Sequence, residues 1–147
     1  MERTIDDTLR YVLLITRHIR KGRVRGAILA LLMDLGFSES LDGISFTQES
    51  IYLRYYDNLL RFNTIYSMVA QRLGLGYDTD LVEQGVRRSI NDAWENGSRR
   101  KWFLLFYPER RTECPTNGQF IARCACLMRL LCDCWDECCD EEADLVG

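Results

Sequence analysis

The seven cysteines are the residues whose chemistry stands out first. Six of them lie within residues 124–139, in pairs with one intervening residue or none. Structural zinc sites usually take ligand pairs with two to four residues between their members, and these pairs come from loops or knuckles. Neighbours at i and i+2 on a helix point about 200° apart, so they chelate one ion poorly. The pattern favours Cys124, Cys134 and Cys138 as small apolar core residues, with a cysteine-rich metal-binding regulator as the alternative.

Catalytic chemistry has few candidate residues in this chain. His18 is the single histidine, and it lies in a basic stretch near the N-terminus. The sequence holds no Gly-x-Ser-x-Gly elbow, no phosphate-binding loop and no His-Glu-x-x-His motif. Carboxylates are plentiful, but no pair of them stands out from ordinary surface acids. We therefore expect a binding protein and not an enzyme, with no catalytic residue, no cofactor and no bound metal.

The charge balance and the apolar pattern limit the partners that we expect. The formal net charge is −3 and the pI is about 5.2, whereas nucleic-acid-binding domains are usually basic, so we expect no nucleic-acid partner. No window reaches the roughly 18 uninterrupted apolar residues of a membrane span, so we expect no integral membrane anchor. The N-terminal stretch carries acids and lacks an apolar signal core, and the odd number of cysteines fits reduced thiols. These features predict a cytoplasmic location.

Apolar residues recur at helical spacing along most of the chain, and no convincing alternating strand is present. The sequence predicts a single all-α domain over residues 1–147, with an acidic tail from about residue 139. We expect Thr47 and Ser50 to open the third helix, and Asp78 or Thr79 to cap the fourth. The expected helices cover residues 4–20, 26–35, 47–73, 81–96, 98–107 and 119–138, with Gly36, Gly74 and Gly76 as helix-ending residues.

The stretch Leu81–Tyr107 organises this prediction. Asn96-Gly97 can supply the left-handed conformation that ends a helix, and Ser98 can cap the next one. Trp102–Tyr107 then has no polar face, so we expect a buried central helix there, although a short apolar run also fits an interior strand. Four residues at four-residue steps form one face of the preceding helix: Val82, Val86, Ile90 and Trp94.

The amphipathic helices before this central segment allow two arrangements. They can splay to leave an apolar groove that accepts a partner helix, or their apolar faces can simply close on each other. The order of several short pieces favours the first. Tyr52–Arg61 holds an acid at Asp57 followed by Arg61, Ala93–Gly97 forms the turn, and Phe103–Tyr107 is the apolar run. In this order the pieces resemble the B-cell-lymphoma-two (Bcl-two) family of apoptosis regulators, especially its short viral members, best over residues 47–107 and loosely over residues 4–20.

The resemblance implies a Bcl-two-like helical bundle around a central hydrophobic helix. It implies an anti-apoptotic, virus-encoded protein that sequesters pro-apoptotic death-motif proteins of the host and is recruited to mitochondria through them. Arg100, or Arg99 as the alternative, would pair with an acid on the bound helix. A helical self-association or scaffold module, buried as a homodimer, is the competing hypothesis. The implied groove residues are Tyr55, Leu59, Phe62, Met68, Val69, Leu73, Val82, Val86, Ile90, Asn96, Gly97, Arg99, Arg100 and Phe103.

Overall fold

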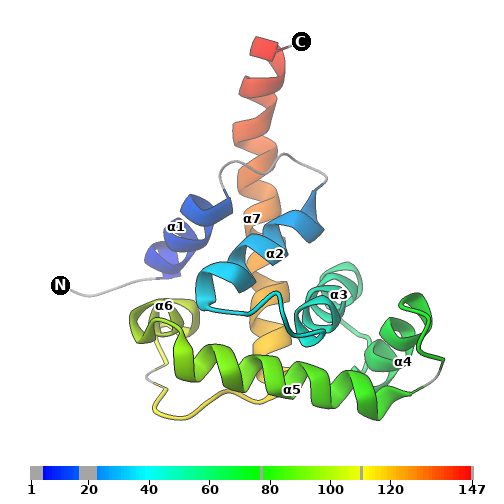
Figure 1. Cartoon of the computed structure of the whole chain (residues 1–147). Coiled ribbons are helices and arrows are strands. Elements are labelled where there is room, and N and C mark those ends of the chain that lie inside the picture. Colours follow the sequence, from blue (N-terminus) through cyan, green and yellow to red (C-terminus); the bar gives the residue numbers. More distant parts are fainter. Residues whose placement is uncertain (1–4, 17–22, 77, 110, 147) are drawn as a thin grey trace.

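The computed structural model describes residues 5–16, 23–76, 78–109 and 111–146, with side chains described within 7–13, 23–76, 78–109 and 111–132. All regular elements of this described part are α-helices, which confirms the all-α prediction. Figure 1 shows their arrangement, with α5 across one end of the molecule and α7 passing behind α2. The helices are α1 (Ile5–Thr16), α2 (Val24–Leu35), α3 (Gly43–Tyr56), α4 (Phe62–Arg72), α5 (Thr79–Asn96), α6 (Arg99–Phe106) and α7 (Asn117–Val146).

The helix at the centre of the bundle is α3. It packs against α2, α4, α5 and α7, and its Ile51 side chain has no exposed surface. The sequence placed the central helix at 98–107, but α6 there is only eight residues long and packs against α1. Its Trp102 and Leu105 reach the core, whereas Phe103 stays half-buried. A short helix has too few turns to be surrounded, so the apolar run covers one side of the core.

The helix expected over residues 47–73 is two helices in the structure. α3 already begins at Gly43, and the Thr47 hydroxyl inside it donates to the Gly43 carbonyl at 2.7 Å, so Thr47 does not open the helix. The break comes at Asp57, whose Oδ1 accepts a hydrogen bond from the Leu59 backbone N–H at 3.0 Å. An aspartate that bonds its own backbone two residues on forms a local turn. Leu59, expected on an apolar helix face, is therefore 85% exposed.

Most of the expected helix ends are confirmed. Gly36 ends α2 in the left-handed conformation, with φ of 107°. Asp78 Oδ1 accepts from the Leu81 backbone N–H at 3.0 Å and caps α5, and Ser98 caps α6 in the same way. Local chemistry is enough to specify these ends, because the Asp78 and Ser98 side chains each bond a backbone N–H three residues on, and glycine at position 36 adopts a positive φ at low steric cost.

Close backbone approaches fix α5 across the ends of α2 and α3. A Cβ on Gly43 would lie 2.1 Å from the Gly85 carbonyl oxygen, so only glycine lets α3 meet α5 there. At the C-terminal end of α5, a Cβ on Gly97 would lie 2.1 Å from the Leu35 carbonyl oxygen. Gly97 has an extended backbone, so the left-handed conformation expected at this turn is wrong. Glycine is needed at position 97 for space and not for handedness.

The prediction that certain cysteines are core residues is confirmed for Cys124, the one of the three whose side chain the structure describes. Cys124 has no exposed surface, and burial raises the pKa of its thiol. Cys134 and Cys138 lie outside the residues with described side chains. Among the described side chains, no three Cys, His, Asp or Glu gather as a metal site would require. Within the described part of the chain, no helix has the length and apolar character needed to span a membrane.

Candidate functional site

The expected floor of the groove is part of the core. Val69 on α4 and Val82, Val86 and Ile90 on α5 have no exposed surface. Both helices turn these residues inward, where α4 and α5 pack against each other and against α3. The apolar faces therefore close on each other, which is the second of the two arrangements that the periodicity allowed.

The remaining groove residues fall into two separate groups. One group lies on α3, on α4 and in the segments flanking α4. The other lies where α5 meets α6, at the end of α5 that is remote from α4 (Figure 1). In the second group Arg100 is exposed, and the Arg99 guanidinium lies 4.2 Å over the Trp94 ring. The first group comprises Tyr55, Leu59, Phe62, Met68 and Leu73, and the second comprises Asn96, Gly97, Arg99, Arg100 and Phe103.

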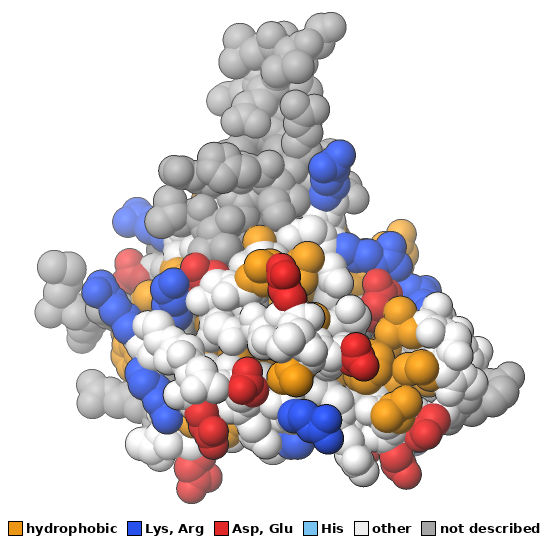
Figure 2. Space-filling model, in the orientation of Figure 1, with side chains coloured by type: hydrophobic (Ala, Val, Ile, Leu, Met, Phe, Trp, Pro, Cys, Tyr) orange, Lys and Arg blue, Asp and Glu red, His pale blue; other side chains and the backbone are white. Residues whose placement is uncertain are grey.

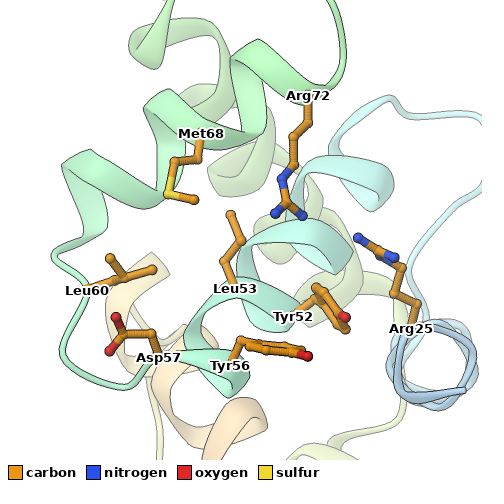
Figure 3. Close-up of a pocket in the computed structure, with 8 residues that line it drawn as sticks. All are labelled: Arg25, Tyr52, Leu53, Tyr56, Asp57, Leu60, Met68 and Arg72. Atoms are coloured by element: carbon orange, nitrogen blue, oxygen red, sulfur yellow. The ribbon is translucent and has the colours of Figure 1, made fainter. Parts of the chain in front are cut away.

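A hollow of about 350 Å³ lies between α3 and α4. Figure 3 shows apolar and aromatic side chains at its centre and two arginines along one side. Those arginines, Arg25 and Arg72, share Glu49 at 2.9 Å and 3.5 Å. Of the expected groove residues, only Met68 lines this hollow. Its lining is Arg25, Tyr52, Leu53, Tyr56, Asp57, Leu60, Met68 and Arg72.

The helices α4 and α5 form a second candidate site. The two helices pack against each other, both pack against α3, and the connection between them contains Gly74 and Gly76 with positive φ. Two packed helices joined by a glycine-containing connection are the elements of a helix-turn-helix unit, and the connection here, residues 73–78, is longer than the usual three to four residues. In such units the second helix presents its outer face to the major groove of DNA.

The outer face of α5 carries side chains suited to that contact. Gln84, Arg88 and Asn91 are exposed and follow each other at four- and three-residue steps, so they share one face. Arginine pairs with guanine, and glutamine and asparagine pair with adenine, through two hydrogen bonds each in the major groove. The Asn91 Oδ1 already accepts from the Arg87 guanidinium, so the groups available for such pairing are those of Gln84 and Arg88. Sequence reasoning missed these residues because it used α5 only for its apolar face. A signal was present: an amide and arginine stripe opposite that apolar face, preceded by a glycine-rich turn and an aspartate cap.

One side of α5 carries an arginine that is hydrogen-bonded to its neighbours, with two more arginines close by. The Arg87 guanidinium donates to Asn91 Oδ1 at 2.7 Å, and its Nη2 lies 2.9 Å from Cys114 Sγ. Burial raises the pKa of the Cys114 thiol, while the guanidinium groups of Arg87, Arg111 and Arg99 act in the opposite direction. Three positive charges therefore lie near Cys114, on the side of α5 next to its exposed stripe.

The net charge of the whole chain conceals this basic character. Seven of the 22 Asp and Glu lie after residue 132, whereas all 19 Lys and Arg precede it. Residues 1–132 therefore carry a formal net charge of +4 (19 minus 15). Figure 2 shows basic and acidic side chains interspersed over the surface that includes α5. The negative total was therefore a poor reason to exclude a nucleic-acid partner.

The comparison with known families overturns the resemblance that the sequence suggested. The family model described as sporulation initiation factor Spo0A C terminal matches residues 28–128, from α2 into α7. No curated protein matches the chain. The matched family is a helical DNA-binding domain, so membership of the Bcl-two family is wrong. The anti-apoptotic function, the viral character and the death-motif partners are wrong for the same reason.

Two further expectations change with this match. The Spo0A C-terminal domain binds DNA, which contradicts the expected absence of a nucleic-acid partner. Recruitment to mitochondria depended on apoptotic partners and has no support without them. The family is regulatory and not a known class of enzyme. Because the match covers more than two thirds of its 147 residues, the chain belongs to the family of the C-terminal domain of the sporulation initiation factor Spo0A.

Proposed function

We propose that this chain is a non-enzymatic, DNA-binding regulatory domain that places α5 in the major groove. The family match supports a DNA-binding role. The observation that carries the proposal is the exposed stripe of Gln84, Arg88 and Asn91 on the second helix of the α4–α5 unit. The cytoplasmic location expected from the sequence stays part of this proposal.

The proposed mechanism relies on α5 being held rigidly by the rest of the bundle. The close contacts at Gly43 and Gly97 fix the middle and the C-terminal end of α5, so its outer face needs no rearrangement to meet a groove. Arg88 would pair with the O6 and N7 atoms of a guanine, and Gln84 with the N6 and N7 atoms of an adenine. Each such bidentate pair contributes about 1–3 kcal/mol of discrimination against the wrong base.

The acidic residues near the ends of α5 indicate which part of the helix would contact the bases. Asp80 and Glu95 are exposed near the two ends of α5 and would be repelled by phosphates. Base contacts are therefore expected from the middle of the helix, between Gln84 and Asn91. A short reading face of this kind would contact only a few successive base pairs.

The proposal is tested by selection from a pool of random-sequence DNA duplexes. Fluorescence anisotropy then compares the affinity for the selected duplex with that for a scrambled one at a fixed salt concentration. A specific domain of this type is expected to favour its own site by at least about 10³-fold. Gln84→Ala should lower this discrimination by about 1–3 kcal/mol. Gln71→Ala, which removes an exposed amide from α4, is the matched control and should leave discrimination unchanged.

The result that would overturn the proposal is equal, weak binding to all duplexes by folded protein. Circular dichroism on the same samples establishes that the helices are present. If the wild type prefers the selected duplex and neither Gln84→Ala nor Gln71→Ala changes that preference, α5 is not the helix that contacts the bases.

A further inference from the structure

Three arginines beside the exposed stripe of α5 each contact an uncharged group. The Arg87 guanidinium donates to Asn91 Oδ1 from both Nη2 and Nε, at 2.7 and 3.2 Å. The Arg99 guanidinium lies 4.2 Å from the centre of the Trp94 ring, and that of Arg111 lies 4.8 Å from the centre of the Phe106 ring. An amide oxygen or an aromatic face orients a guanidinium without cancelling its charge.

The fold brings these three arginines to one side of α5. Arg87, Asn91 and Trp94 follow at four- and three-residue steps, so they share a side of the helix, and Arg99 stacks on the last of them. At 1.5 Å per residue, Arg87 and Trp94 lie about 10 Å apart along the axis. Cys114, which touches both Arg87 and Asn91, brings the segment that carries Arg111 to the same side. The influence of all three guanidinium groups on the Cys114 thiol agrees with this placement.

The positive charge of this group is only partly compensated. Among the described residues, Glu109 is the acid paired with Arg111, at 3.1 Å, and its side chain is 59% exposed. Arg111 itself is only 14% exposed, and its buried Nε has no hydrogen-bond partner within the described part of the chain. A buried guanidinium N–H without an acceptor is costly, so such a group gains from an anion that reaches it.

We propose that Arg87, Arg99 and Arg111 form a binding site for phosphate groups on the flank of α5. A guanidinium binds phosphate oxygens through paired, charge-assisted hydrogen bonds, and three oriented guanidinium groups suit this ligand better than a neutral one. The DNA backbone would supply the phosphate, a point that rests on the proposed function. The site then fixes the register of α5 in the groove without reading sequence, while Gln84 and Arg88 read bases.

The test measures how DNA affinity depends on salt in the full chain. Each phosphate contact contributes about 0.9 to the magnitude of the slope of log affinity against log salt, or about an eightfold change in affinity for each tenfold change in salt concentration. Arg99→Gln is the first variant, because Arg99 is exposed and its loss should leave the fold intact. It should reduce the slope by about 0.9 and weaken binding to selected and scrambled duplexes equally. Arg99→Lys keeps the charge and should restore most of the slope.

Two more variants separate a local site from a general loss of charge. Arg61→Gln removes an exposed arginine from the loop between α3 and α4 and should leave the slope unchanged. Arg111→Gln should reduce the slope as Arg99→Gln does. Because Arg111 is nearly buried, the thermal unfolding of the Arg111→Gln variant is measured as well. A change in its salt slope supports the phosphate site only if the variant unfolds at the same temperature as the wild type.

A second arm asks whether the site takes a phosphate that is not part of DNA. Pyrophosphate is titrated into the ¹⁵N-labelled chain, and shifts of the arginine side-chain N–H signals are followed. Pyrophosphate binding that Arg99→Gln abolishes supports the phosphate site even if the wild type binds no DNA, in which case only the DNA proposal fails. If the DNA salt slope and the arginine signals are both unaffected, the phosphate site is wrong, whether or not DNA binds through Gln84 and Arg88.

Discussion

The contact between Gly43 and Gly85 gives a sharp prediction about what holds α5 in position. A Cβ added at Gly43 would lie 2.1 Å from both the Gly85 carbonyl oxygen and the Ser89 Oγ, and 2.8 Å from the Gly85 carbonyl carbon. Ordinary van der Waals contact begins near 3.4 Å. Relief therefore requires α3 and α5 to separate by about 1 Å, because backbone atoms cannot rotate away. Overpacking of this kind typically costs about 1–3 kcal/mol, and we expect Gly43→Ala to lie at the upper end.

Gly85→Ala, the opposite half of the same contact, should behave differently. Its Cβ would lie 2.5 Å from the Phe46 ring, which is a side chain and can rotate by a small angle. Replacing glycine by alanine inside a helix also gains about 1 kcal/mol of helix propensity, which offsets much of the remaining clash. We expect the free energy of unfolding of Gly85→Ala to stay within about 1 kcal/mol of the wild type.

Urea unfolding followed by circular dichroism measures both variants under the same conditions. The difference between them should be about 2–3 kcal/mol, a large share of the stability of a domain of this size. Equal stabilities for Gly43→Ala and the wild type would refute the tight helix crossing. A larger loss for Gly85→Ala than for Gly43→Ala would show that side-chain crowding, and not the backbone approach, limits the distance between α3 and α5.

Three further predictions concern single side chains. Trp102 Nε1 donates to two backbone carbonyl oxygens at 3.2 and 3.3 Å, so Trp102→Phe should lower the free energy of unfolding by about 2–4 kcal/mol in urea titrations. Burial, with a hydrogen bond to Asp34, raises the pKa of the Tyr11 phenol, so its contribution to the free energy of unfolding is complete below pH 10 and is lost as pH rises further. A Tyr11→Phe variant should not show this loss between pH 10 and 11. Iodoacetamide at pH 8 should label exposed Cys126 well before buried Cys124, as read by peptide mass spectrometry, and equal rates would contradict the core position of Cys124.

Local sequence chemistry predicted the helices and several of their ends correctly. The Asp78 and Ser98 caps and the Gly36 stop act within a few residues, so no knowledge of the fold is needed to find them. The break between α3 and α4 was missed because the apolar spacing continues through Leu59, while Asp57 turns the chain locally. Periodicity reports which residues could share a face, and it does not report a polar turn that interrupts the helix.

The position of each helix in the bundle was harder to predict than its existence. The apolar run 102–107 indicated a central helix, but the helix that contacts most of the others is α3, whose buried residues include the small Gly43, Thr47 and Ser50. Small residues allow close packing, which an apolar pattern does not reveal. The outer stripe of α5 was not predicted, because apolar periodicity reports only the buried face of a helix and the seven acidic residues after 132 make the net charge negative. The Bcl-two resemblance rested on three short pieces, and their order alone did not specify the fold family.

The most direct test of DNA reading by α5 is a titration of the selected duplex into the ¹⁵N-labelled chain. Backbone signals between Gln84 and Asn91, with the side-chain N–H signals of Gln84, Arg88 and Asn91, should shift most on binding. Arg88→Ala should remove the preference for one base pair and leave the other positions unchanged. Shifts confined to the hollow between α3 and α4, with those of α5 unchanged, would contradict the placement of α5 in the major groove.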